Sequence, residues 1–105
     1  MIPRHGEIWL VDLGKAAQGR AVVVLQANSL TAPRALLICV PITRQSRDSE
    51  VEVPLGHLKF LERDAVANTQ GIHALPATRF EKRLGSLPPA DLAAIKVALA
   101  EACSL

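Results

Sequence analysis

The fold is decided by residues 20–43, which read RAVVVLQANSLTAPRALLICVPIT. Two short apolar runs, residues 21–25 and 35–40, are separated by a polar connection rich in turn-forming residues. Each run is β-branched or apolar throughout and too short for a typical helix, which predicts two strands buried on both faces. In an antiparallel hairpin, the start of the first strand lies beside the end of the second. Arg20 and Thr43 would then meet at one rim of the sheet.

The composition indicates one folded domain, residues 1–105, with a single modest core. Half of the residues are hydrophobic, which argues against a disordered chain. The net charge of +2 permits binding to a polyanion without requiring it. The aromatic residues are Trp9, Phe60 and Phe80, and there is no Tyr. So few rings argue against a platform on which bases stack without regard to sequence.

The cysteines and the N-terminal segment indicate the cellular compartment. Cys39 and Cys103 are far apart, and the chain has no CxxC and no His/Cys cluster with zinc spacing, so we expect no metal and no cofactor. Cys39 lies in an apolar run and is expected to be a buried, unreactive thiol. The N-terminus lacks a signal-peptide pattern, and no apolar stretch reaches membrane-spanning length. These features predict a cytoplasmic protein that does not contact a membrane.

The remaining segments add short strands and loops. Beyond the central hairpin, strands are expected at residues 7–12, 51–53, 65–69, 72–75 and 82–87, and a turn or a single helical turn at 76–80. Residues 13–19 read as a loop with glycine near both ends. Residues 43–50 contain no large apolar residue and are expected to form a solvated loop.

The C-terminal segment, residues 89–103, predicts a helix. Leu92, Ile95, Leu99 and Ala102 recur at three- and four-residue spacing on one face. A proline stands where a capping residue is expected, so Ser86 is the candidate cap. Several short strands followed by one helix predict a mainly β fold, as a small barrel or a strongly bent sheet with the helix packed on it.

Polar residues at the ends of the expected strands form the candidate site. They are Arg20, Thr43, Arg44, Gln45, Gln70, His73 and Arg79. The chain has no nucleophile elbow and no glycine-rich phosphate loop. The set suits a phosphodiester, and RNA especially, because RNA carries its own nucleophile in the 2′-OH. Arg side chains can neutralise and bind phosphate oxygens, and a Thr hydroxyl can donate to one. By themselves these residues do not single out a nuclease.

Each candidate also has a structural interpretation. Arg20 could form a surface ion pair, and Thr43 could bond the backbone of a turn. His73 could be a partly buried structural histidine or could contact RNA. Arg44 and Arg47 could belong to a solvated loop or position phosphates. The other two histidines, His5 and His57, lie in loop-like segments and are expected to be solvated.

The ordered motifs resemble the MazF/PemK family of toxins. The resemblance rests on GEIWLVDL (6–13), GR followed by VVVL (19–25), VPIT (40–43) and RFEKRLGSL (79–87) before a terminal helix. It implies an SH3-like small barrel of the MazF/PemK/CcdB type with a C-terminal helix, as a homodimer. It also implies a metal-independent, sequence-specific endoribonuclease that cleaves single-stranded RNA, often mRNA. Its products carry a 2′,3′-cyclic phosphate and a 5′-OH, and a cognate antitoxin with an acidic flexible tail blocks the groove.

The resemblance also assigns the catalytic residues, by position. The family's catalytic Arg opens the second strand and matches Arg20, and its catalytic Thr or Ser ends the third strand and matches Thr43. The remaining polar candidates become the expected RNA-binding set, which is Arg44, Gln45, Arg47, Gln70, His73 and Arg79.

The chain departs from the family pattern at three places. Ala21 follows Arg20 where the family usually has Pro, and residues 13–19 form a short loop without the Glu-Gln pair common there. His73 stands where many members have Arg. These departures motivate a second hypothesis, a non-catalytic toxin-fold module that binds an antitoxin, or an inhibitor of a protein target as the similarly folded CcdB is of gyrase. A general nucleic-acid-binding barrel is disfavoured by the mild charge and the few aromatic residues.

Overall fold

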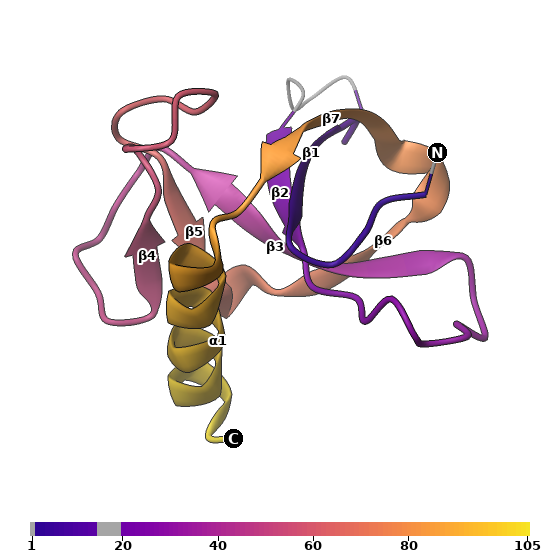
Figure 1. Ribbon diagram of the computed structural model, residues 1–105. Coiled ribbons are helices and arrows are strands. Elements are labelled where there is room, and N and C mark those ends of the chain that lie inside the picture. The colour runs from indigo at the N-terminus through magenta and orange to yellow at the C-terminus, as the bar shows by residue number, and fades with distance from the viewer. Residues whose placement is uncertain (1, 15–19) are drawn as a thin grey trace.

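The computed structural model describes residues 2–14 and 20–105. Over these residues the chain forms seven strands, two 3₁₀ turns and one α-helix (Figure 1). Their bounds in chain order are β1 Glu7–Val11, β2 Arg20–Val24, β3 Leu36–Thr43, β4 Glu52–Pro54, β5 Val66–Asn68, η1 Thr69–Gly71, β6 His73–Pro76, η2 Ala77–Arg79, β7 Phe80–Ser86 and α1 Pro89–Cys103. All paired strands are antiparallel. The predicted mainly β fold with a C-terminal helix is confirmed.

Strand β3 is the centre of the sheet, whose order is β4-β5-β3-β2-β1-β7, with β6 also paired to β3. One edge of β3 pairs with β2, as predicted, with Val22 opposite Pro41. The other edge pairs with β6 over the first half of β3 and with β5 over its last two residues. This double pairing bends the sheet strongly. Figure 1 shows β7, β1, β2, β3 and β6 curling into a ring, while β4 and β5 lie beside α1.

Alternation along β2 and β3 divides the interior into two clusters. Val23 and Val40 face the larger cluster, which includes Ile95 of α1. Val22 and Cys39, one residue away on each strand, face a smaller cluster on the other side of the sheet. The Cys39 thiol is fully buried, and burial raises its pKa to about 11, which agrees with the predicted unreactive thiol.

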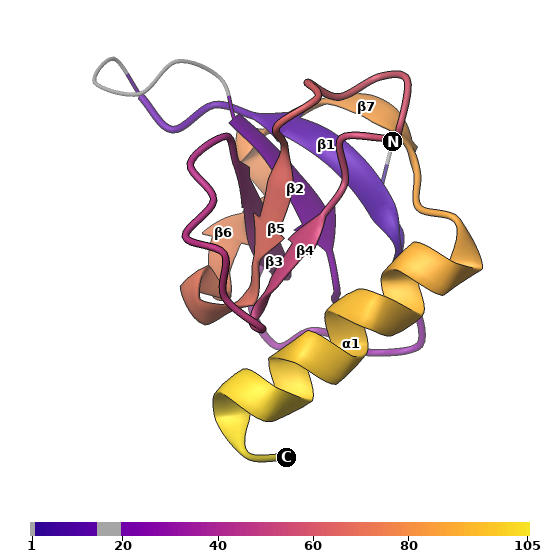
Figure 2. The ribbon, with the colours of Figure 1, turned by 90° about the vertical axis from the view of Figure 1, so that its left-hand side faces the viewer.

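Helix α1 has the predicted bounds and packs mainly through Ile95 and Ala98, which are buried. Figure 2 shows it lying across the strands on one side of the sheet. The predicted cap by Ser86 is wrong, because Pro88 occupies the N-cap and the backbone N–H of Asp91 donates to its carbonyl. His57 is exposed, as the sequence predicts. Its Nε2 lies 2.9 Å from Asp91 Oδ1, so its loop is tied to the start of the helix.

Strands β3, β7 and β4 differ from the prediction. The first half of β3 is not buried on both faces, since Ile38 is 41% exposed. Helix α1 contacts β4 and η1, and Ile95 of the helix packs in the same cluster as Val40 and Ile42, in the second half of β3. The last strand begins at Phe80, two residues earlier than predicted, because β1 continues the pairing as far as Val11. β4 includes Pro54, which an edge strand tolerates.

The loop predicted at residues 13–19 lies partly outside the described residues, from 15 to 19. Within the described part, Gly14 has φ +95°, and its N–H donates to Asp12 Oδ1. This backbone region favours glycine, as the sequence indicated. Among residues 2–14 and 20–105 no helix combines the length and apolar character that crossing a membrane requires.

Candidate active site

The β2–β3 pairing brings Arg20 and Thr43 to the same rim. Val22 lies opposite Pro41 in this antiparallel pair. Arg20, two residues before Val22, therefore comes opposite Thr43, two residues after Pro41, on the same face of the sheet. Both residues line a groove of about 490 Å³, together with Pro41. The juxtaposition that the hairpin predicted is therefore present. It follows from strand register, not from any local sequence motif.

The rest of the groove comes from the β3–β4 loop (residues 44–51), β4, β5 and η1. The further lining residues are Gln45, Arg47, Ser49, Val51, Glu52, Asn68 and Gln70. Three of them, Gln45, Arg47 and Gln70, belong to the predicted set. Sequence reasoning missed Asn68, although its position at the end of an expected strand was an available signal. It also missed Glu52, for which the sequence offers no local signature.

Three predicted RNA-binding residues lie outside this lining. Arg44 Nε lies 2.8 Å from Asp64 Oδ1, and this hydrogen bond and charge raise the pKa of Arg44 and lower that of Asp64. His73 is exposed, which rules out the partly buried interpretation, and its Nδ1 lies 2.8 Å from the Gly71 carbonyl. Arg79 Nη1 lies 3.5 Å from the Asp12 carbonyl. Contact of these three with RNA remains a prediction.

The Thr43 hydroxyl has a defined orientation. Its Oγ1 accepts a hydrogen bond from the Gln45 backbone N–H at 3.2 Å. This is the turn contact that the structural interpretation of Thr43 proposed. It occupies an oxygen lone pair and leaves the hydroxyl hydrogen available to donate. Thr43 can therefore shape the turn and donate to a ligand oxygen in the groove.

The floor of the groove depends on a close approach between η1 and β3. Asn68 Oδ1 caps η1 by accepting from the Gln70 N–H at 3.2 Å. A Cβ atom on Gly71 would lie 2.8 Å from Pro41 Cγ, so only glycine allows η1 to sit this near Pro41. The buried Thr69 donates both its N–H and its hydroxyl to the Val51 carbonyl, at 3.1 and 2.6 Å. These contacts anchor the far end of the β3–β4 loop.

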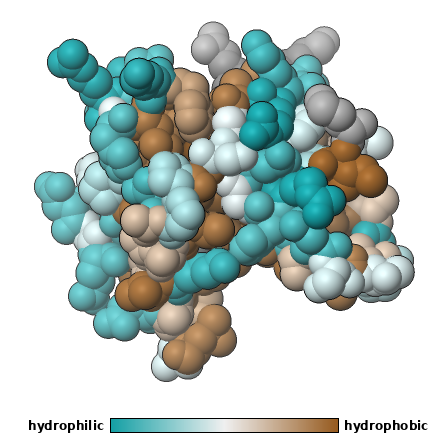
Figure 3. Space-filling model, viewed as in Figure 1, coloured by the Kyte–Doolittle hydropathy of each residue, from teal (hydrophilic) through white to brown (hydrophobic). Residues whose placement is uncertain are grey.

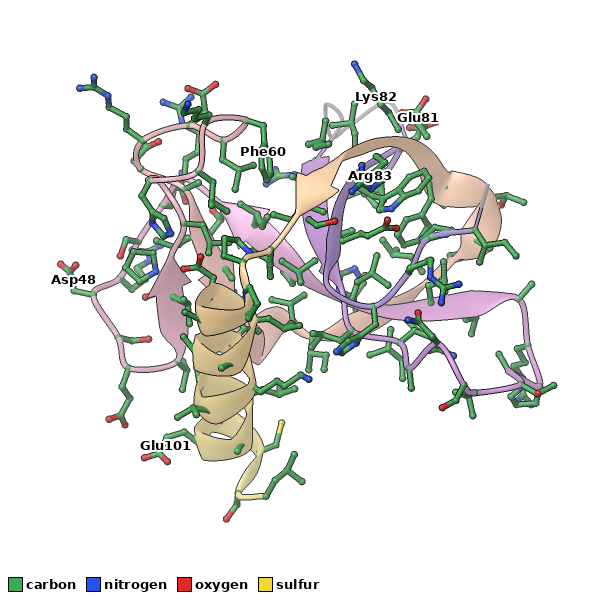
Figure 4. The ribbon with its side chains drawn as sticks, in the orientation of Figure 1. Asp48, Phe60, Glu81, Lys82, Arg83 and Glu101 are labelled. Carbon is green, nitrogen blue, oxygen red and sulfur yellow. The ribbon has the colours of Figure 1, made fainter. Side chains whose placement is uncertain are left out.

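The charges of the lining suit a phosphodiester. Arg20 and Arg47 supply two guanidinium groups against the single carboxylate of Glu52. A guanidinium binds phosphate oxygens through two parallel hydrogen bonds. Asp48, at the outer edge of the loop, directs its carboxylate into solvent in Figure 4 and is not part of the lining.

Comparison with known proteins places the chain in a family. Residues 4–103 match the family described as PemK-like, MazF-like toxin of type II toxin-antitoxin system. The probable endoribonuclease MazF2 of Mycobacterium tuberculosis (strain ATCC 25618 / H37Rv) is 31% identical over 90 residues, which cover 85% of this chain and 86% of that protein. An endoribonuclease solved in complex with its cognate antitoxin from Mycobacterial species aligns with a TM-score of 0.85 and 25% identity over 98% of this chain and 96% of that one. The MazE–MazF structure (Form-II) from Deinococcus radiodurans shares the fold, with a TM-score of 0.83 and 19% identity over 100% of this chain and 98% of that one. The chain therefore belongs to the PemK-like, MazF-like family of toxins of type II toxin–antitoxin systems.

Proposed function

We propose that this protein is a toxin that acts as a metal-independent, sequence-specific endoribonuclease on single-stranded RNA, mRNA included. The observation that carries the proposal is the meeting of Arg20 and Thr43 in one groove. Relatives named as endoribonucleases support the activity. The products are RNA fragments with a 2′,3′-cyclic phosphate and a 5′-OH.

The proposed chemistry uses the RNA's own 2′-OH as the nucleophile. The bond from O2′ to phosphorus forms, and the bond from phosphorus to O5′ breaks. The 2′-OH loses a proton and the O5′ leaving group gains one. The Arg20 guanidinium stabilises the negative charge that develops on the phosphorane, and the Thr43 hydroxyl donates to a non-bridging oxygen.

Other groove residues hold the RNA on either side of the cut. Arg47 is suited to a neighbouring phosphate, a contact that adds affinity without reading sequence. The side-chain amides of Gln45, Asn68 and Gln70 each carry a donor and an acceptor, which is the chemistry that reads base edges. We assign sequence preference to these amides.

The proposed partner is a cognate antitoxin with an acidic, flexible tail. The positive charge of Arg20 and Arg47 complements such a tail, which would occupy the groove in place of RNA. We also propose a homodimer in the cytoplasm. Helix α1 supports the dimer because it leaves apolar side chains outside, visible in the lower part of Figure 3, with Val97 71% exposed. Light scattering at micromolar concentration should give about twice the 11.3 kDa of one chain.

The test of the activity is incubation of the purified protein, free of antitoxin, with a mixed-sequence single-stranded RNA in EDTA. The ends of the products are then mapped, with the same sequence as a duplex for comparison. We expect discrete cuts in the single strand with cyclic-phosphate ends. No cutting by the folded protein across diverse RNAs would favour the non-catalytic module or the inhibitor of a protein target.

A further inference from the structure

Glu52 places a carboxylate in a groove that, by the function proposed above, receives a polyanion. Its side chain lines the groove together with Arg20 and Arg47. A like charge near a phosphate opposes binding. A carboxylate at this position therefore requires a compensating role, and its hydrogen bonds indicate what that role is.

Both oxygens of the Glu52 carboxylate accept backbone hydrogen bonds from the β3–β4 loop. Oε1 accepts from the N–H of Arg47 at 3.0 Å and from that of Ser49 at 3.1 Å. Oε2 accepts from the Arg47 N–H at 3.1 Å. Hydrogen bonds to an ionised acceptor are about twice as strong as neutral ones. Between the two donors lies Asp48, whose φ of +51° makes the sharp turn that the carboxylate spans.

Besides the contact of Arg44 with Asp64, three points hold the loop, and Glu52 is the middle one. The near end is fixed by the bond from the Gln45 N–H to Thr43 Oγ1, and the far end by the bonds from Thr69 to the Val51 carbonyl. Glu52 itself sits in β4, opposite Asn68 of β5. The segment that carries Arg47 is therefore tied to β4 through the Glu52 carboxylate and through the Glu52 N–H, which donates to the Ser49 carbonyl at 3.2 Å.

We propose that Glu52 is a positioning residue for RNA binding. Its carboxylate holds the backbone of residues 47–49 so that the side chains of Gln45 and Arg47 face the groove before RNA arrives. Ordering a binding loop in advance removes an entropy cost from association. Arg20 and Thr43 sit on β2 and β3, so their backbone positions do not depend on residues 47–49, and Thr43 Oγ1 meets the loop only at the Gln45 N–H.

Positioning and simple charge predict opposite signs, which makes the proposal testable. If Glu52 acted only as a negative charge, its removal would tighten RNA binding. If it orders the loop, removal weakens binding although the groove becomes more positive. Glu52→Ala removes all three acceptor contacts. Glu52→Gln keeps the shape and one acceptor oxygen, but turns an N–H₂ donor toward the Arg47 N–H.

The experiment measures binding and cleavage separately. Binding uses a mixed-sequence oligoribonucleotide with 2′-O-methyl groups, which cannot supply the nucleophile, and cleavage uses the unmodified RNA. We expect Glu52→Ala to raise Kd and KM roughly tenfold and Glu52→Gln by a few fold, with kcat within about twofold of wild type. Glu50→Ala is the matched control, since it removes the same charge two residues from Glu52. The Glu50 side chain is not part of the lining shared by Arg20, Arg47 and Glu52; it lines the groove between β4 and α1, which Glu52 also borders. Glu50→Ala should leave Kd unchanged or slightly lower.

A second arm places Glu52→Ala in an Arg47→Ala background. If Glu52 works by presenting Arg47, much of its effect on Kd should disappear there, since residues that act as one unit are not additive. Thermal melting of every variant checks the fold, and Glu52→Gln decides the matter if Glu52→Ala does not fold.

Unchanged or tighter binding by both Glu52 variants would overturn the proposal, as would a fall in kcat with KM unchanged. A different result would contradict the proposed ribonuclease activity and leave the role of Glu52 intact. A wild type that binds the 2′-O-methyl probe in a Glu52-dependent way without cutting RNA would retain the positioning role and lose the ribonuclease. A wild type that neither binds nor cuts would remove both.

Discussion

Successive residues of β2 and β3 point to opposite faces of the sheet, and the two faces serve different roles. On one face Val23 and Val40 pack in the core with α1. On the other, Arg20 and Thr43 stand at the rim of a polar groove, above a much smaller buried cluster. Stability and chemistry are therefore separated in this sheet by strand alternation, not by distance along the chain. Substitutions on the two faces should therefore change different measured quantities.

The largest effect is expected for Arg20→Ala. Loss of the cation that faces the phosphorane should slow single-turnover RNA cleavage about a thousandfold. The melting temperature should change little, because the Arg20 side chain is exposed. Lys82→Ala is the control, since it removes an exposed cation on β7 that points away from the molecule in Figure 4. Similar cleavage by Arg20→Ala and Lys82→Ala would remove Arg20 from the active site.

On the other face, Ile95→Ala should act on stability alone. Ile95 is fully buried against the core, and truncation of such a side chain costs about 2–5 kcal/mol of unfolding free energy. Denaturant titration measures this loss, and the cleavage rate per folded molecule should stay near that of wild type. If cleavage by the folded fraction falls with stability, the two faces are coupled.

A smaller loss of activity is expected for Thr43→Ala. Removing one hydroxyl that donates to the phosphate should slow cleavage about a hundredfold. Thr43→Ser keeps the hydroxyl and should recover most of the rate. Equal rates for the Ala and Ser variants would mean that Thr43 serves the turn through its bond to the Gln45 N–H and not the reaction.

Gly71→Ala should affect both quantities, because Gly71 joins the floor of the groove to the sheet. The added Cβ would lie 2.8 Å from Pro41 Cγ and force η1 or Pro41 to move. Overpacking of this kind costs about 1–3 kcal/mol. Cleavage should fall as well, since Pro41 and Gln70 both line the groove. Unchanged stability and activity would show that η1 and Pro41 accommodate the added methyl group without loss of unfolding free energy or cleavage rate.

The smallest effect is a pH dependence that belongs to stability alone. Burial raises the pKa of the Glu7 carboxyl, but hydrogen bonds from Trp9, the Arg4 N–H and Arg83, together with the Arg83 charge, outweigh it and lower the pKa. A carboxyl whose pKa is lowered in the folded state stabilises the fold at pH values above its ordinary pKa of 4.5. This stabilisation is lost as the pH falls through the pKa of the folded state. Glu7→Gln should therefore reduce the acid dependence of the denaturation midpoint and leave cleavage at neutral pH unchanged. An acid dependence equal to that of wild type would assign the effect to other carboxyls.

The sequence predicted what depends on local pattern. The hairpin and its register placed Arg20 beside Thr43, and apolar spacing placed α1 at residues 89–103. Glu52 could not be found in this way, and Asn68 was missed although it lies at the end of an expected strand. They reach the groove because two three-residue strands, β4 and β5, add to the edge of β3, an arrangement that no short motif encodes. The exposure of Ile38 escaped prediction for a similar reason, since it depends on how much of β3 the helix covers.

The most direct test of the proposed chemistry is a single atom change in the substrate. Once a cut has been mapped, the nucleotide on its 5′ side is replaced by its 2′-deoxy form, and the wild-type protein is incubated with this RNA in EDTA. We expect cleavage at that position to disappear while other cuts persist and the RNA still binds. Cleavage there at the normal rate would show that the nucleophile is not the RNA's own 2′-OH, and would contradict the roles given to Arg20 and Thr43.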